Sequence, residues 1–427
     1  MKLIRTYGKT AAQAETILRQ IEGRSGAATG RLEPAVKRIL ADIRRKGDAA
    51  LRRYAERLDG FEPATDMQVT QQEMAAAWDE TPKELRKSLQ AAAANIGRFA
   101  RWQMPKEWTR KLPGVKLGQC ALPLDSVGCY VPGGRYPLPS TLLMTVIPAQ
   151  VAGVKRIVVV SPRPARETLA AAHLAGVKEL YRIGGAQAIA ALAYGTASVP
   201  RVDKIVGPGN LYVTTAKKLV AFECGIDMLA GPTEIVVASE NGNPQWIAAD
   251  IVAQAEHDPE ALAVLVTSNP KLAQETAKEV QIQASLNKIA SQAIARNGFI
   301  FLTKTKNETE TVTNRLASEH LTIDKQSDLA WVHHAGSIFI GANTPQSMGD
   351  YISGPNHVLP TGRLARVRGG LSVYDFIRLI TTQEYEAAGL AQHGPHVERL
   401  ATAEGLLGHA ASVRIRDADH ASRRREQ

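Results

Sequence analysis

The chain is too long for a single core. It has 427 residues, of which 44% are hydrophobic and only 5% aromatic, so we expect two or more domains with helices packed on parallel strands rather than an all-β sandwich. No apolar run approaches the length of a membrane span. Three cysteines, Cys120, Cys129 and Cys224, lack a CxxC spacing and argue against a disulfide framework or a cysteine zinc site.

The formal net charge of +10 raises the question of a nucleic-acid partner. Lys and Arg are scattered over amphipathic segments, however, and the one dense cluster, Arg423–Arg425, contains no aromatic residue. We interpret the excess as solvated surface that also favours an anionic ligand such as a dinucleotide, with nucleic-acid binding as the weaker alternative. Because no apolar block follows the first ten residues and free thiols suit a reducing compartment, a cytoplasmic location is expected.

The first quarter of the chain is predicted to be helical. Residues 9–22 form an amphipathic helix, and the Gly/Ser/Ala-rich stretch 23–30 indicates a hinge, which would make this helix an arm. From Glu33 to Phe99 apolar residues recur at helical spacings, with breaks at Gly60 and Pro82. Loose alternation from Trp108 to Val131 then predicts strands or a hairpin.

Regular alternation of strands and helices follows, which predicts two parallel α/β units with a boundary near Gly231–Pro232. The first has strands at 157–160, 179–183 and 204–206 and helices at 165–175, 186–194 and 211–222. The second has strands at 234–238, 263–267, 299–302 and 337–340 and helices at 243–259, at 271–296 and up to Ala317. Beyond Leu371 we predict helices at 373–380 and 397–407 and a basic end without fixed structure.

Turns after parallel strands are where such folds bind ligands, so the Gly-rich turns 131–134, 184–187 and 207–210 are candidates for a nucleotide site. The last two open helices whose free N–H groups could hold phosphate oxygens. None is a GxGxxG fingerprint, and ordinary tight-turn chemistry explains them about as well.

The helix 243–259 carries a more specific signal. Asn243 as N-cap and Pro244 at the first helical position mark its start. Gln254 continues the apolar stripe and His257 lies three residues further on the same side, so two potential metal ligands project together. The alternative is that Gln254 sits at the edge of a core and His257 caps the last turn.

Other histidines have chemically suggestive neighbours. Glu319 directly precedes His320, which offers two bases that titrate at different pH, as acid–base catalysis needs. His357 follows Asp350 closely, and His409 follows Glu404 by five residues. Imidazole, carboxylate and amide oxygen suit zinc or a similar divalent ion. Taken singly, each is more readily structural than functional.

Cys129, beside Tyr130 and a Gly-rich turn, supports a rival hypothesis in which a thiol forms a covalent adduct with an aldehyde. A small buried residue is the favoured interpretation.

These pieces, in this order, resemble the histidinol dehydrogenase family over almost the whole chain. The segments that carry the resemblance are Gly128–Gly134, Gly184–Ile189, Val206–Asn210, Ala230–Glu234, Gln254–His257, Ser318–Leu321, Gly349–Tyr351, Gly354–Pro360 and Glu404–Leu406.

The resemblance implies a zinc-dependent enzyme that oxidises L-histidinol to L-histidine with two NAD+ in succession, through a bound histidinaldehyde. His320 would be the base for the first oxidation, and Glu319 would activate water for the second. The zinc ligands it implies are Gln254, His257, Asp350 and His409; these and His320 also bind substrate, with Thr233, His357 and Glu404. The NAD site would be lined by Tyr130, Gln187 and Asn210.

The expected architecture is α/β, with two incomplete Rossmann-like parallel-sheet domains and small helical terminal arms. The expected parts are an arm at 1–25, a discontinuous substrate and metal domain at 26–128 plus 234–370, a nucleotide domain at 129–233 and a C-terminal arm at 371–427. The family's domain-swapped homodimer would bring His409 from a partner subunit.

Two positions depart from the family pattern. Thr233 stands where serine is usual, which keeps the hydroxyl, and Thr322 stands where many members carry an acidic residue. A paralogue that oxidises another small polar alcohol, such as a sulfonated polyol, is the first alternative. A zinc-containing binding protein without chemistry is the second.

Overall fold

The computed structural model describes residues 1–62, 65–133 and 136–425, without the side chains of residues 25–29 and 418–425. The chain divides into unit 1, Met1–Gln103 with Leu124–Phe376, and unit 2, Met104–Pro123 with Ile377–Gln427. Unit 1 contains two parallel sheets, as the sequence predicts, and unit 2 contains a small antiparallel sheet with two helices. Among the described residues, no helix combines the length and the apolar character that crossing a membrane requires.

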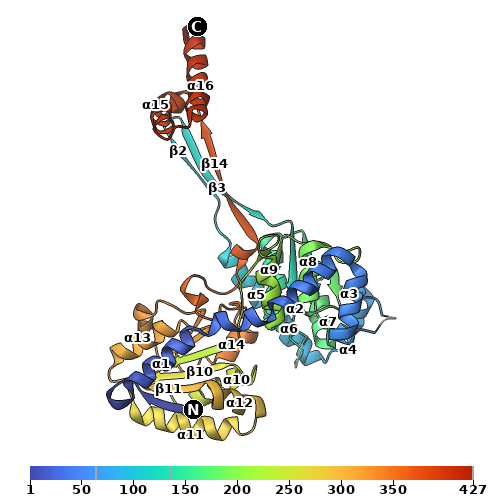
Figure 1. Ribbon diagram of the computed structural model, residues 1–427, viewed down its shortest axis with the longest axis vertical. Helices are drawn as coiled ribbons and strands as arrows, with labels where there is room; N and C mark the ends of the chain where they lie inside the picture. Colours follow the sequence, from blue (N-terminus) through green and yellow to red (C-terminus); the bar gives the residue numbers. More distant parts are fainter. Residues whose placement is uncertain (63–64, 134–135, 426–427) are drawn as a thin grey trace. The chain divides into compact units, whose positions relative to one another are not determined.

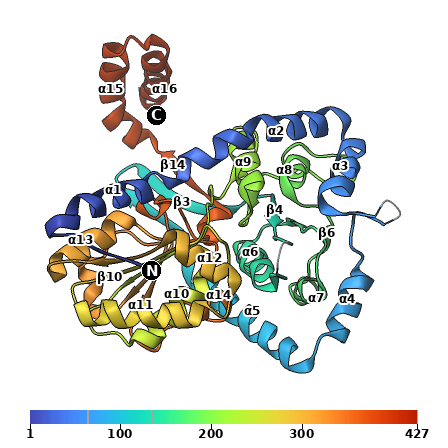
Figure 2. The ribbon, with the colours of Figure 1, turned by 60° about the horizontal axis from the view of Figure 1, so that its bottom comes forward.

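The first sheet of unit 1 has six parallel strands in the order β1-β11-β10-β9-β12-β13. Its three central strands are buried along their whole length, because helices cover both faces. Helices α10–α12 cover one face and α1 with α13 the other (Figure 2). The bounds are β1 Lys2–Arg5, β9 Glu234–Ala238, β10 Leu262–Thr267, β11 Gly298–Leu302, β12 His320–Ile323, β13 Ser337–Ile340, α1 Ala11–Glu22, α10 Pro244–Ala255, α11 Pro270–Ala284, α12 Lys288–Asn297, α13 Lys306–Leu316 and α14 Gln346–Tyr351.

The second sheet has five parallel strands in the order β6-β5-β4-β7-β8, also with helices on both sides (Figure 1). Its strands are short, so the surrounding helices supply most of the buried surface. The bounds are β4 Ser126–Tyr130, β5 Arg156–Val160, β6 Glu179–Tyr181, β7 Lys204–Val206, β8 Gly225–Ile226, α2 Arg24–Lys46, α3 Asp48–Tyr54, α4 Gln71–Glu80, α5 Lys83–Gln103, α6 Pro139–Ala152, α7 Arg166–Leu174, α8 Gly185–Tyr194 and α9 Leu211–Val220.

The N-terminal segment differs from the predicted arm. Lys2–Arg5 forms the edge strand β1, which pairs with β11, and α1 packs on the same sheet. The hinge predicted at 23–30 is wrong, because only Gly23 breaks the helix and α2 begins at Arg24. The predicted substrate and metal domain, 26–128 plus 234–370, includes Val36, Ile39 and Leu51, and these residues share a core with the second sheet.

Unit 2 corrects the prediction for the C-terminal part. The helix expected at 373–380 is a short 3-10 turn, Val373–Asp375, followed by the nine-residue strand β14, Ile377–Tyr385. That strand pairs antiparallel with β3, Val115–Pro123, over its whole length, and β2, Trp108–Leu112, completes the sheet. Helices α15, Ala387–Ala403, and α16, Leu407–Arg425, follow, so the basic end is helical as far as it is described.

Candidate functional site

The candidate acid–base pair lies at the amino end of the first sheet. Thr233 immediately precedes β9, and Glu319 immediately precedes β12, which begins at His320. Because β9 and β12 are parallel neighbours with His320 opposite Ile235, Thr233 and Glu319, which are 86 residues apart in sequence, are brought side by side. These candidate residues therefore lie at the end of the sheet opposite to the carboxyl strand ends, where parallel sheets usually bind ligands.

Hydrogen bonds fix both members of the pair. Oε2 of Glu319 accepts from the Thr233 hydroxyl at 2.6 Å and from the Glu234 backbone N–H at 2.9 Å. Nδ1 of His320 lies 3.0 Å from Nε2 of Gln254 and 3.2 Å from the Glu234 carbonyl oxygen. The Gln254 amide also donates to the Thr233 hydroxyl at 2.8 Å. These side chains therefore form one buried network.

The other end of the His320 ring is unengaged. Nε2 is buried and has no hydrogen-bond partner among the described residues, and its nearest carboxylate oxygen in an ion pair, Oδ1 of Asp350, is 3.6 Å away. The ring stacks on Phe339 with centroids 5.9 Å apart, which holds its plane. A histidine that is oriented at one nitrogen and open at the other is arranged to exchange a proton with a bound molecule.

Burial and the neighbouring carboxylates have opposite effects on the pKa of His320. Burial alone would lower the pKa of His320, but the carboxylates of Glu319 and Asp350 raise it to about 10. Burial raises the pKa of Asp350, and the facing His320 outweighs this and leaves it lowered. A divalent cation on Asp350 would oppose the upward shift at His320, because it would neutralise the charge that faces Nε2.

Three of the four implied metal ligands belong to unit 1. Gln254 ends the buried face of α10, His257 follows that helix, and Asp350 comes from α14. The Gln254 amide nitrogen donates to the Thr233 hydroxyl and lies 3.0 Å from Nδ1 of His320, so the carbonyl oxygen of Gln254 is the atom left for a ligand. His320 and, to a smaller extent, His257 contribute to the lowered pKa of Asp350. Amide oxygen, imidazole and carboxylate form a donor set that fits zinc.

The fourth implied ligand belongs to unit 2. Within the described ranges, no group of three or more His, Cys, Asp or Glu side chains is placed to hold a metal ion. The remaining implied ligand, His409, and the implied substrate residue, Glu404, lie in unit 2, where Glu404 caps the end of α15 and His409 is an exposed residue in the first turn of α16. Their supply by a partner subunit remains a prediction.

His357 is held inside the protein. Nδ1 lies 2.8 Å from the Asp350 carbonyl oxygen and Nε2 3.1 Å from the Thr141 hydroxyl, and burial lowers the pKa of His357. In this arrangement the neutral imidazole braces the end of α14. Thr141, on α6, gave no signal in the sequence because it lies 216 residues before His357.

Two N–H groups of the turn at 184–187, those of Gly184 and Gly185, are already engaged within the protein. The Gly184 N–H donates to Oδ2 of Asp59 at 3.0 Å, and the Gly185 N–H donates to the Tyr130 hydroxyl at 3.1 Å. Nε2 of Gln187 donates to the same Asp59 oxygen at 3.0 Å, while its Oε1 is buried without a partner among the described residues. Burial raises the pKa of Asp59. Asp59 therefore organises a turn 125 residues away, which no local pattern reveals.

The turn at 207–210 is also internally engaged. Oδ1 of Asn210 caps α9 by accepting from the N–H groups of Tyr212 and Val213, at 3.0 and 3.2 Å. Asn210 is exposed to solvent. Gly207 has φ +113°, and a Cβ there would lie 2.2 Å from the Tyr130 carbonyl oxygen, so only glycine fits. The predicted contacts of Tyr130, Gln187 and Asn210 with NAD remain predictions.

A buried ion pair supports the turn at 207–210. Lys217 contacts Oδ1 of Asp227 and donates to the Gly207 carbonyl oxygen at 2.9 Å, while Oδ2 of Asp227 accepts from the Gly207 N–H at 2.8 Å. The side chains of Lys217 and Asp227 are 3% and 0% exposed. The buried side chains of Lys217 and Asp227 therefore hold both the carbonyl oxygen and the N–H group of Gly207 in place.

Removal of one charge of this pair is expected to destabilise the protein strongly. Lys217→Met should lower the free energy of unfolding by about 3–5 kcal/mol, because it leaves Asp227 buried and uncompensated. The neighbouring Lys218→Met should cost less than about 1 kcal/mol, because its ion pair with Glu33 is exposed. Urea titration of both variants measures the difference, and equal losses would show that the buried pair is not specially stabilising.

Cys129 is not placed for covalent chemistry. It is fully buried in β4, and burial raises the pKa of its thiol to about 12, so a negligible fraction is thiolate near neutral pH. The favoured interpretation, a small core residue, agrees with this position.

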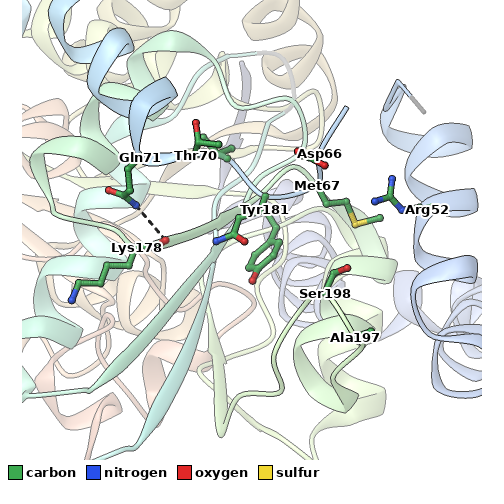
Figure 3. Close-up of a pocket in the computed structure, with 11 residues that line it drawn as sticks. Arg52, Asp66, Met67, Thr70, Gln71, Lys178, Tyr181, Ala197 and Ser198 are labelled. Carbon is green, nitrogen blue, oxygen red and sulfur yellow. Dashed lines mark hydrogen bonds between the residues drawn. The ribbon is translucent and has the colours of Figure 1, made fainter. Parts of the chain in front are cut away.

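A pocket of about 660 Å³ lies along the edge strand β6, apart from these residues (Figure 3). Segment 66–71 forms one wall and pairs there with β6, and Arg52 and Lys178 lie at opposite sides. None of the predicted site residues lines it.

Comparison with known proteins gives consistent matches. The family model described as Histidinol dehydrogenase matches residues 23–417. Histidinol dehydrogenase of Synechococcus sp. is 45% identical over 400 residues, which cover 90% of this chain and 92% of that protein. That of Geobacillus kaustophilus is 46% identical over 395 residues, which cover 90% and 93%. The crystal structure of histidinol dehydrogenase from Elizabethkingia anophelis superposes with a TM-score of 0.90 at 35% identity, covering 97% of this chain and 98% of that one.

These matches, together with the parallel sheets and the buried Glu319–His320 pair, identify the chain as an α/β oxidoreductase. The match extends over both units and includes the stretches that carry every predicted site residue. The chain belongs to the histidinol dehydrogenase family.

Proposed function

We propose that this enzyme oxidises L-histidinol to L-histidine in two successive NAD+-dependent steps, with zinc bound and the intermediate histidinaldehyde retained. The observation that carries the proposal is the buried pair of Glu319 and His320, with the open Nε2 of His320 facing Asp350 beside Gln254. The family relationship supports the choice of substrate. The step would complete histidine biosynthesis.

Gln254, His257 and Asp350, with His409 of a partner subunit, would hold the zinc ion. When bound, zinc would supply a fixed positive centre that orients the substrate, so that its reacting carbon lies within reach of the two bases. Thr233, His357 and Glu404 would position the substrate further. NAD+ bound near Tyr130, Gln187 and Asn210 supplies the hydride acceptor for each oxidation.

The two bases would act in turn. In the first oxidation, Nε2 of His320 takes the proton of the substrate hydroxyl, for which it needs to be unprotonated. In the second, Glu319 takes a proton from the water molecule that adds to the aldehyde carbon. Oε2 of Glu319 is occupied by Thr233 and the Glu234 N–H, so Oε1 is the atom that would receive this proton.

The proposal includes a domain-swapped homodimer in the cytoplasm. The exposed Glu404 and His409 of unit 2 would then reach the site of the neighbouring subunit. Three free cysteines, Cys120, Cys129 and Cys224, support a reducing compartment.

Turnover of L-histidinol by the purified, zinc-loaded enzyme tests the proposal. NADH absorbance and chromatography of the products should give two NADH and one histidine for each histidinol consumed, and chelation should abolish both until zinc is restored. Sulfonated and amino polyols are assayed in parallel. NADH formation from one of these alcohols, with none from histidinol, would favour the paralogous activity and contradict the proposal.

A further inference from the structure

Glu234 is a buried carboxylic acid beside the acid–base pair, and the proposed mechanism gives it no task. It is the first residue of β9 and only 7% exposed. Its backbone contacts both reactive side chains, since its N–H donates to Glu319 at 2.9 Å and its carbonyl oxygen lies 3.2 Å from Nδ1 of His320. The position of this one peptide segment therefore sets the orientation of both bases.

The side chain of Glu234 ties that segment to a distant loop. Its Oε1 accepts from the Gly362 N–H at 3.0 Å, and nearby the Gly231 N–H donates to the Thr361 hydroxyl at 2.5 Å. Segment 231–234 is thus fastened at both ends to residues 361–362. This loop follows His357, so the tie connects the acid–base pair to the neighbourhood of Asp350.

The loop needs to be held. Gly362 and Arg363 both have left-handed backbone conformations, with φ +59° and +67°, and Arg363 is not a glycine. For a residue with a side chain, this conformation is unfavourable, so neighbouring contacts must fix it. The Glu234 carboxylate supplies such a contact on the residue just before Arg363.

A carboxylate is a costly choice at this place. Glu234 lies close enough to Glu319 for the two like charges to repel, and burial disfavours its charged form as well. The guanidinium of Arg24 offsets only part of this. Stability alone would favour an apolar side chain here, whereas an acceptor for the Gly362 N–H requires an oxygen at the end of a long side chain.

We propose that Glu234 is a positioning residue: its hold on Gly362 fixes the peptide segment that orients Glu319 and His320. The inference rests on the proposed function, because turnover of histidinol is its readout. A positioning role needs only a hydrogen-bond acceptor, whereas a role in proton transfer needs a carboxylic acid. Glutamine and methionine, which have similar length, separate the two.

The test compares three variants. Glu234→Gln keeps the acceptor and should retain kcat within about threefold of the wild type. Glu234→Met keeps the volume but lacks the acceptor, and its kcat should fall by about 10–100-fold with little change in KM, the scale expected when reacting groups are misplaced by up to 1 Å. Glu240→Gln is the matched control, because its carboxylate accepts from Ser268 beyond the opposite end of β9, and should leave kcat unchanged.

Each result decides the question. Loss of activity in both the Gln and the Met variants would overturn the proposal in favour of proton transfer, and wild-type kcat in the Met variant would show that the tie is dispensable. Glu234→Ala provides a second acceptor-free variant if the Met variant does not fold. A wild-type enzyme without histidinol turnover would refute the proposed function instead, since the variants are compared only with an active parent.

Discussion

Replacement of His320 with Asn is expected to slow the first oxidation of histidinol by about 10²–10⁴-fold, the usual contribution of a positioned general base. Asparagine keeps a polar atom near Nδ1, where Gln254 and the Glu234 carbonyl oxygen contact the ring. It has no group at the position of Nε2, the nitrogen that is open to a substrate. Stopped-flow NADH formation in a single turnover measures the loss.

The His320→Asn variant should still bind zinc and histidinol. Zinc content and the calorimetric affinity for histidinol are expected to stay near wild-type values, because the implied ligands Gln254, His257 and Asp350 are unchanged. His333→Asn, which alters an exposed histidine, is the matched control and should turn over normally. A His320→Asn enzyme that retains wild-type turnover would contradict the assignment of His320 as the base.

Replacement of Glu319 with Gln should separate the two oxidations. The first needs His320, whereas the second needs a base for the water that adds to the aldehyde, and an amide cannot take that proton. NADH formation from added histidinaldehyde is therefore expected to fall by about 10²-fold or more. Glutamine can still accept from Thr233 and the Glu234 N–H, so the first step should be much less affected.

The stoichiometry gives an independent readout for this variant. A single enzyme turnover should yield one NADH per histidinol instead of two, with aldehyde that can be trapped by a hydrazine reagent. Two NADH at the wild-type rate would show that Glu319 does not activate the water.

Much of the fold follows from local sequence patterns. Asn243 and Pro244 mark the start of α10, and the structure shows Asn243 accepting from the Gln245 N–H at 2.9 Å. The buried strands β9, β10 and β11 are apolar except for Glu234 at the start of β9 and Thr267 at the end of β10, so their prediction needed no knowledge of their neighbours. The prediction of two parallel sheets is confirmed.

The strands that were not predicted share a physical cause: each depends on a pairing partner far away in sequence. Strand β12, which begins at His320, has four residues and exists through its pairing with β9 and β13. Strand β14 pairs with β3, so Ile380 lies opposite Cys120, 260 residues away, and this pairing overrides the helical spacing read at 373–380. Local periodicity carries no information about partners at such separations.

For the candidate site, the sequence indicated the reactive residues but not the residues that support them. Residue types and resemblance pointed to Gln254, Glu319, His320 and Asp350, which the structure places in one neighbourhood. The supporting residues Glu234, Thr141 and Asp59 were missed, since each acts on a partner that is far away in sequence. Their roles depend on the fold that brings the strand ends together.

Side chains of unit 1 are expected to bind one zinc ion next to His320. Anomalous diffraction at the zinc edge from crystals of the zinc-loaded enzyme tests it most directly. We predict one peak per subunit at about 2.0–2.2 Å from ligand atoms of Gln254, His257 and Asp350, completed by His409 of the partner subunit. A fully loaded, active enzyme whose zinc peak lies elsewhere would contradict the account.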